Sequence, residues 1–171
     1  MTAPEPTLHM LCGKIAAGKS SLAARLGAQP LTVIVSEDKW MAPLFGDALK
    51  EVADYVRLSA RLRAAMAPHL ADLLKAGMSV VLDYPANTLA NRAWMKGIAD
   101  EAGAAHQLHW LDLPDEVCKA RLRARNAAGG HEFAPTDAHF DLITSYFVAP
   151  TAAEGLEILV HRPEEGRHDA A

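Results

Sequence analysis

The stretch from Leu8 to Ser20 constrains the fold more than any other part of the sequence. It reads LHMLCGKIAAGKS: a short apolar run, then two glycines five positions apart, then lysine and serine. The apolar run Leu8–Cys12 is typical of a buried strand. The segment Ser20–Leu26 has a helical composition and stops at Gly27. We therefore expect a strand, a glycine-punctuated turn and a helix in direct succession.

The turn has the G-x-x-x-x-G-K-[ST] spacing of a phosphate-binding loop. Glycines let successive backbone N–H groups turn inward around phosphate oxygens, and the helix N-terminus adds its dipole. In such a loop Lys19 contacts the β- and γ-phosphates of a nucleotide, and the Ser20 hydroxyl ligates Mg²⁺. A glycine-punctuated turn without a ligand is the alternative. The candidate nucleotide-binding residues form one continuous segment: Gly13, Lys14, Ile15, Ala16, Ala17, Gly18, Lys19, Ser20 and Ser21.

The rest of the chain alternates between strand and helix patterns. Apolar or β-branched runs predict four more strands, at residues 32–35, 79–83, 107–111 and 156–160. Helical patterns cover residues 47–76, 88–103, 114–125 and 137–147, and Pro68 predicts a kink or a break into two helices. This alternation predicts a three-layer α/β fold with a five-stranded parallel sheet. Ligands of such folds bind at the carboxyl ends of the strands.

Length and composition indicate a single globular domain. The chain has 171 residues, half of them apolar and 22% charged, with a net charge of −4. That charge gives no overall attraction to nucleic acid or to anionic membranes. No apolar run approaches the roughly 20 residues of a membrane span, and the N-terminus does not read as a signal peptide. We expect a cytoplasmic protein with no membrane partner, one domain over residues 1–163 and a disordered tail at 164–171. Cys12 and Cys118 are expected to be buried thiols.

Two aspartates follow predicted strands at the same edge of the sheet. Asp38, in the segment VSEDKW, can face the γ-phosphate and take a proton from an incoming hydroxyl. Equally, Ser36, Glu37 and Asp38 suit the cap and first turn of a following helix. Asp83 ends the strand VVLD, where it can hold a water on Mg²⁺ and accept a hydrogen bond from Ser20. The alternative for Asp83 is a cap on the next turn.

Arginines precede a polar segment that we interpret as a lid. Residues 125–136 interrupt the helical pattern and contain two consecutive glycines. Arg121 and Arg125 lie four residues apart on one helix face, whereas Arg123 points elsewhere. A lid arginine can stabilise the migrating phosphoryl group, although each could also be an ordinary solvated side chain. Arg57 and Arg61 form another such pair, for which a solvated helix face is the simpler interpretation.

The sequence resembles the small P-loop kinases grouped with polynucleotide 5′-kinases, zeta toxins and chloramphenicol phosphotransferase. The resemblance rests on LCGKIAAGKSSLA, VSEDKW, VVLDYPANTLANR and LRARN, over residues 8 to about 126. It implies a nucleoside-kinase-like P-loop fold with ATP and Mg²⁺ as cofactors. It also implies that Asp38 is the general base, that Asp83 belongs to the metal site and that Arg92 matches a family arginine. The lid arginines of the family fall within Arg121–Arg125.

Two departures from the family pattern bear on the phosphate acceptor. Polynucleotide kinases carry an arginine three residues after the base, where this chain has Met41. The phosphate loop is filled by Lys-Ile-Ala-Ala rather than by Pro-Gly-Ser or a similar sequence. The first expectation is therefore a small-molecule hydroxyl acceptor, and a 5′-hydroxyl polynucleotide is the second.

Lys14 raises a third alternative. Dimeric ATPase switches carry a lysine at this place that reaches the nucleotide of the partner subunit. They follow it with glycines and are longer, whereas this chain has Ile15 and Ala16 there. Lys14 is thus expected to contact phosphate or acceptor within one subunit, in a monomer or weak homodimer. A non-catalytic or dimeric switch stays open as the alternative to an enzyme.

Overall fold

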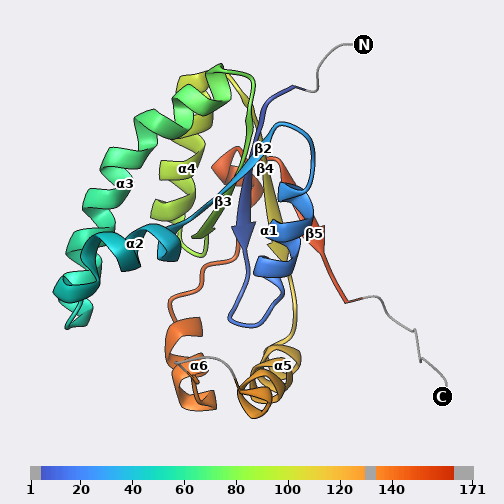
Figure 1. Cartoon of the computed structure of the whole chain (residues 1–171). Coiled ribbons are helices and arrows are strands. Elements are labelled where there is room, and N and C mark those ends of the chain that lie inside the picture. Colours follow the sequence, from blue (N-terminus) through green and yellow to red (C-terminus); the bar gives the residue numbers. More distant parts are fainter. Residues whose placement is uncertain (1–4, 130–133, 164–171) are drawn as a thin grey trace.

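A five-stranded parallel sheet forms the centre of the molecule (Figure 1). The computed structural model describes residues 5–129 and 134–163. Part of the predicted lid and the predicted tail lie outside the described residues. The strand order is β2-β3-β1-β4-β5, and every pair is parallel. The strands are β1 (Thr7–Cys12), β2 (Thr32–Ser36), β3 (Ser79–Pro85), β4 (Ala105–Leu111) and β5 (Ile158–His161).

Helices cover both faces of this sheet. Helix α1 (Lys19–Gly27) packs on one face, and α3 (Val52–Lys75) and α4 (Leu89–Ala102) pack on the other. The remaining helices are α2 (Glu37–Phe45), α5 (Asp115–Ala128) and α6 (Asp137–Thr144), with short 3-10 turns at Gly46–Ala48 and Ala152–Glu154. In Figure 1, α5 and α6 lie beyond the carboxyl ends of the strands. The predicted three-layer α/β architecture is confirmed.

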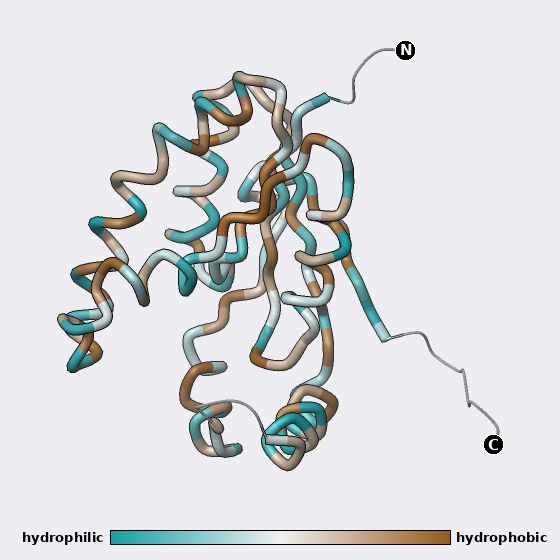
Figure 2. The backbone as a smooth tube through the Cα atoms, in the orientation of Figure 1, coloured by the Kyte–Doolittle hydropathy of each residue, from teal (hydrophilic) through white to brown (hydrophobic). Residues whose placement is uncertain are grey.

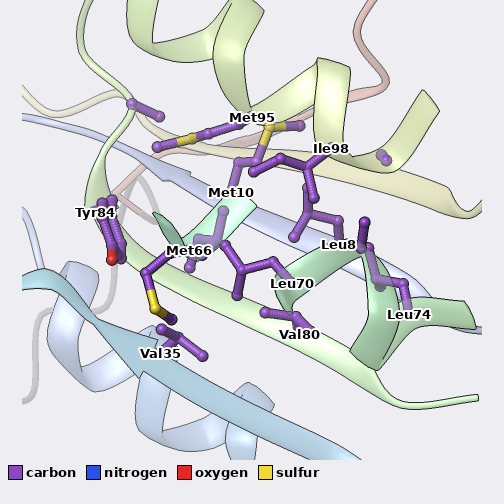
Figure 3. Close-up of a cluster of buried hydrophobic side chains, with 14 of the residues drawn as sticks. Leu8, Met10, Val35, Met66, Leu70, Leu74, Val80, Tyr84, Met95 and Ile98 are labelled. Carbon is purple, nitrogen blue, oxygen red and sulfur yellow. The ribbon is translucent and has the colours of Figure 1, made fainter. Parts of the chain in front are cut away.

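Two hydrophobic clusters hold the layers together. The larger lies between the sheet and α3 and α4, where Met10, Leu70 and Met95 are buried against one another (Figure 3). Figure 2 shows hydrophobic and hydrophilic residues alternating along α3 and α4, as expected for helices that bury one face. The smaller cluster joins α1 and α5 to the opposite face and includes the fully buried Cys118 and Leu122. Both cysteines are free and buried, as predicted.

Several predicted boundaries are wrong. Residues 47–51 are not in α3, because Glu51 and Asp54 form a capping box that begins the helix at Val52. Pro68 does not divide α3 into two helices, and buried residues on both sides of it keep the helix against the core. Helix α6 ends at Thr144, and β5 begins two residues later than predicted. Helix α5 continues through Ala128, over the first residues of the predicted lid.

The strand order fixes where a ligand can bind. After β1 the chain passes to β2 and β3 on one side, and it then crosses β1 to reach β4 and β5 on the other. The carboxyl end of β1 is therefore the topological switch point, where ligands of such sheets bind. The turn that follows β1 is the predicted phosphate loop. Within the described ranges, no helix is long and apolar enough to cross a membrane.

Candidate active site

The predicted phosphate loop has a tightly curled backbone. Gly18, which precedes α1, has φ 102°, a left-handed conformation that favours glycine. Ala16 also has a positive φ, of 61°, which is unusual for a residue with a side chain. The Ala17 N–H donates to the Lys14 carbonyl at 3.2 Å and closes the curl. Sparsely populated conformations of this kind concentrate at functional sites.

Lys19 folds back over the loop. Its ammonium donates to the Gly13 carbonyl at 2.7 Å and to the Lys14 carbonyl at 2.8 Å. Burial lowers the pKa of Lys19 from its usual value, the Arg125 charge acts in the same direction, and the Asp83 carboxylate opposes them. Since neutral carbonyls are weaker partners for an ammonium than phosphate oxygens, Lys19 can exchange them for a triphosphate.

A cavity of about 580 Å³ opens beside the loop. From α5 it is lined by Arg121 and Arg125, and the rest of its wall comes from the loop and α1: Ile15, Ala16, Gly18, Lys19, Ser20 and Ser21. Arg121 donates to the Ala17 carbonyl at 3.4 Å, whereas the buried Nε of Arg125 has no hydrogen-bond partner among the residues that the structure describes. Arg123 points away and pairs with Asp137, its Nε 3.1 Å from that carboxylate. The structure thus brings Arg121 and Arg125 to the loop, and not Arg123.

The two acidic residues after β2 have different environments. Glu37 is buried and takes hydrogen bonds from Arg63 at 3.0 Å and from the Tyr55 hydroxyl at 2.9 Å. Asp38 is exposed in the first turn of α2. Glu37 is therefore occupied in holding α2 against α3, and of the two carboxylates Asp38 is the one available to a ligand.

Asp83 and Ser20, the predicted metal ligands, have side-chain oxygens without protein partners among the described residues, and their role at a metal stays a prediction. Asp83 lies opposite Ser36 in the β2–β3 register, at the carboxyl edge of the sheet, and its charge acts on Lys19. Within the described part of the chain, neither the Asp83 carboxylate nor the Ser20 hydroxyl takes part in a hydrogen bond. Oxygen ligands of this kind suit Mg²⁺, which keeps several waters and binds through few protein ligands.

Sequence reasoning missed Asn87, the residue that holds the start of the loop. Its side-chain oxygen accepts from the Gly13 N–H at 2.9 Å, and its amide donates to the Gly13 carbonyl at 3.0 Å. The Asn87 carbonyl also accepts from the Val148 N–H at 2.9 Å. The available signal was its place four residues after Asp83, at the same sheet edge.

The Arg63 network was missed as well. Arg63 links Glu37 to Asn91, whose side-chain oxygen lies 2.9 Å away, and its guanidinium lies 5.8 Å from the centre of the Trp94 ring. No short sequence pattern signals these contacts, because Arg63 and its partners come from three different helices.

Arg92 is fully buried and lies in a structural cluster. It pairs with Glu154, with Nε 2.6 Å from that carboxylate, and donates to the carbonyls of Ala86 and Val148 at 3.0 and 2.8 Å. All these partners are protein groups, so Arg92 braces the fold beneath the site. Arg57 pairs with Asp54 on the surface of α3, as expected for a solvated helix face.

Lys14 extends away from the curl of the loop toward α5. Its ammonium pairs with the Asp115 carboxylate, donates to the Leu113 carbonyl at 3.3 Å and lies 5.9 Å from the centre of the Phe147 ring. The Lys14 side chain thus contacts α5 and the segment before it, and its predicted contact with phosphate stays a prediction.

Comparison with known protein families identifies the family of this chain. Residues 8–150 match the family model AAA_33, described as an AAA domain. The chain belongs to this family. The match to AAA_33 spans the phosphate loop, Asp38, Asp83 and α5, and it confirms the resemblance to small P-loop kinases. No curated protein matches the sequence significantly.

Solved structures with the same fold include several kinases. A protein of Chloroflexus aurantiacus described as a candidate kinase has a TM-score of 0.71 and 19% identity, over 93% of this chain and 89% of its own. The APS kinase CysC of Mycobacterium tuberculosis, solved with AMPPNP and APS, has a TM-score of 0.64 and 19% identity, over 95% and 91%.

The Pnkp1/Rnl/Hen1 RNA repair complex contains a third similar chain. Its TM-score is 0.60 and its identity is 23%, over 85% of this chain but only 45% of that one. At these identities the similarities establish the fold alone. This AAA_33 protein has the fold of P-loop kinases.

Proposed function

We propose that the protein is an ATP-dependent phosphotransferase that moves the γ-phosphate to a hydroxyl of a small molecule. The observation that carries this proposal is the cavity at the phosphate loop, where Lys19, Arg121 and the unpartnered Nε of Arg125 converge. Three cationic side chains beside a curled loop of backbone N–H groups suit a triphosphate. The APS kinase of the same fold was solved with AMPPNP, which supports a nucleotide at this position.

Each residue of the site has a role in this reaction. The oxygen of the acceptor hydroxyl attacks the γ-phosphorus while Asp38 accepts the proton of that hydroxyl. The bond between the γ-phosphorus and the β–γ bridging oxygen breaks, and ADP is released. Lys19 and Arg125 neutralise charge on the phosphoryl oxygens. Ser20 and Asp83 would hold Mg²⁺, which would neutralise charge that develops on the phosphates. Positioning and charge supply most of the rate enhancement in such chemistry.

The nucleoside is proposed to lie in an adjoining cavity of about 220 Å³. This cavity shares Gly18, Ser21 and Arg121 with the phosphate cavity, so one ligand can occupy both. Leu22 and Leu113 give it an apolar wall, and Arg25 and Arg162 line its rim. Apolar surface with a few polar groups is typical of a site for a flat base.

Two arginines of α3 are already paired with carboxylates, which supports an uncharged acceptor. Arg63 is neutralised by Glu37, and Arg57 by Asp54. Met41, at the position of the polynucleotide-kinase arginine, is buried in the core and presents no charge. A phosphate-bearing acceptor would need unpaired cations, as nucleic-acid binding does.

The test is phosphate transfer from γ-labelled ATP with Mg²⁺, to a fractionated metabolite extract and to 5′-hydroxyl oligonucleotides in parallel. Lys19→Ala should abolish productive nucleotide binding. Asp38→Asn should leave ATP affinity unchanged and lower turnover by about 10²-fold or more. Asp47→Asn is the matched control, since Asp47 is another exposed aspartate in the segment after β2. Normal turnover of Asp38→Asn would show that Asp38 is not the base.

A 5′-hydroxyl polynucleotide is the second candidate acceptor. The similarity to a chain of the Pnkp1 RNA repair complex favours it. It predicts label on the oligonucleotides and an affinity that falls steeply with added salt. A dimeric switch would instead need a free Lys14 side chain, and here that side chain is held within its own subunit.

A further inference from the structure

We infer that Lys14 is a positioning residue that couples occupancy of the phosphate loop to the placement of α5. The inference rests on the proposed function and assigns a role to Lys14, an unusual residue of the phosphate loop. Asp115, Leu113 and Phe147 surround the Lys14 ammonium, and all three belong to segments outside the loop.

The backbone of Lys14 has a separate connection to the loop interior. Its carbonyl accepts from the Lys19 ammonium at 2.8 Å and from the Ala17 N–H at 3.2 Å. A triphosphate in the loop draws the Lys19 ammonium toward its β- and γ-phosphates. The Lys14 carbonyl then loses a charged donor, while the Lys14 side chain stays fixed to α5. Binding of a triphosphate can therefore affect α5 through Lys14.

The orientation of α5 at Asp115 determines where Arg121 and Arg125 lie. Asp115 is the first residue of the helix, and Arg121 and Arg125 follow six and ten residues later. At 1.5 Å per residue these distances are about 9 and 15 Å along the helix axis. A tilt of about 5° at Asp115 therefore moves the backbone at Arg125 by about 1.3 Å. Misplacements of about 1 Å can cost around 10²-fold in rate.

Core packing and the Lys14 pair have different effects on α5. Cys118 and Leu122 are fully buried in the smaller core cluster, so the helix stays attached without Lys14. The Lys14 and Asp115 side chains are 21% and 48% exposed, and pairs of this kind contribute little to stability. We therefore expect the Lys14–Asp115 pair to set the orientation of α5, whereas core packing keeps the helix attached to the sheet. Loss of the pair should leave the melting temperature within about 3 °C of wild type.

Asn87 holds the start of the phosphate loop, next to Lys14. Asn87 holds Gly13 through two hydrogen bonds and also binds the backbone of Val148, next to Phe147. Asn87 thus ties Gly13, which precedes Lys14, to the segment that contains Phe147. The Asp115 carboxylate is the contact through which the Lys14 side chain acts on α5.

The test measures the response of α5 to a nucleotide analogue. The probe is AMPPNP with Mg²⁺, its affinity is measured by titration calorimetry, and amide exchange is followed in peptides from residues 116–124. In wild type, AMPPNP should slow exchange there by about fivefold or more. In Lys14→Met and Asp115→Asn, the affinity should change by less than about threefold while the slowing is lost. Lys14→Arg, which retains the charge, should restore it.

The matched control is Asp141→Asn. Asp141 pairs with Lys119, another residue of α5, but it links the helix to α6 and not to the loop. This variant should keep the exchange response. A normal response in Lys14→Met would overturn the inference. Loss of AMPPNP binding in Lys14→Met would also overturn it, because the side chain would then be a direct phosphate ligand.

Activity separates this inference from the function on which it rests. If an acceptor is phosphorylated, Lys14→Met should lower kcat by about tenfold or more and leave the KM for ATP within about threefold. Failure of wild type to bind AMPPNP would overturn both the proposed function and the coupling. A normal exchange response without phosphate transfer to any fraction would overturn the kinase alone.

Discussion

Two arginines of α3 and α4, Arg63 and Arg92, are used in the opposite way from two arginines of α5, Arg121 and Arg125. Arg63 and Arg92 have carboxylate partners in Glu37 and Glu154, together with further hydrogen bonds to amide or carbonyl oxygens. Among the described residues, Arg121 has one long contact to a carbonyl, and the buried Nε of Arg125 has no hydrogen-bond partner. An unpartnered buried donor costs about 1–3 kcal/mol. The first pair stabilises the fold, and the second retains donors that a phosphate can satisfy.

Removal of Arg92 should give the largest effect on stability. Arg92→Leu leaves Glu154 without its partner beside the core, and we expect the free energy of unfolding to fall by about 3–5 kcal/mol. Urea denaturation followed by tryptophan fluorescence measures this loss. Arg57→Ala, which breaks an exposed pair with Asp54, should change it by less than about 0.5 kcal/mol. Equal losses in the two variants would erase the distinction between buried and exposed arginines.

Removal of Arg125 should affect turnover and not stability. Arg125→Ala should lower kcat by about 10²–10³-fold, since a preorganised donor to the phosphoryl group is lost. Its melting temperature should stay level or rise, because an unsatisfied donor is removed. Arg123→Ala, two residues away and paired with Asp137, should keep kcat within about threefold. Should Arg123→Ala lose as much activity as Arg125→Ala, the cavity would not identify the catalytic arginine.

Asn87 connects the phosphate loop to the structural part of the protein, so its removal should affect nucleotide binding. It touches the phosphate loop through Gly13 and the segment after α6 through Val148. Asn87→Ala removes two hydrogen bonds to Gly13, each worth about 1 kcal/mol, so AMPPNP affinity should fall by up to about 30-fold. Calorimetric titration gives the value. An unchanged affinity would show that the loop keeps its geometry without Asn87.

A row of three hydrogen-bonded histidines, His9, His109 and His161, predicts how the stability depends on pH. The His109 ring is hydrogen-bonded to His9 at 3.0 Å and to His161 at 3.1 Å. Burial, with the charges of His9, His161 and Arg25 acting in the same direction, lowers the pKa of His109 from 6.5 to about 4. Below pH 6.5 the unfolded chain binds a proton that the folded His109 does not. Stability should therefore fall with pH down to about 4, by at most about 1.4 kcal/mol per pH unit for this residue.

Urea denaturation between pH 7.5 and 5 measures this slope. His109→Gln should flatten it, because the group whose pKa differs between the two states is gone. His69→Gln is the control, since His69 is exposed on α3. A slope that His109→Gln leaves unchanged would assign the acid sensitivity to other groups.

Sequence patterns alone predicted the parallel α/β fold, the glycine-spaced loop after β1 and the location of Asp38 and Asp83 near the carboxyl edge of the sheet, although Asp38 lies in the first turn of α2 and β3 continues to Pro85. These features follow from local signals. A buried strand is a continuous apolar run, a curled loop needs glycine spacing, and carboxyl ends of parallel strands meet at one edge. Element boundaries were less accurate, because caps such as the one formed by Glu51 and Asp54 depend on side-chain geometry.

Only the tertiary structure decided which charged residues are free. Arg92 and Arg125 look alike in sequence, yet one has Glu154 as a partner 62 positions away and the other has an unpartnered Nε. The pairing of Lys14 with Asp115 spans 101 positions. No local pattern encodes such contacts, because folding brings the partners together from separate elements. The electrostatic role of a side chain depends on that three-dimensional neighbourhood, which is why the same residue type braces the fold in one place and serves the site in another.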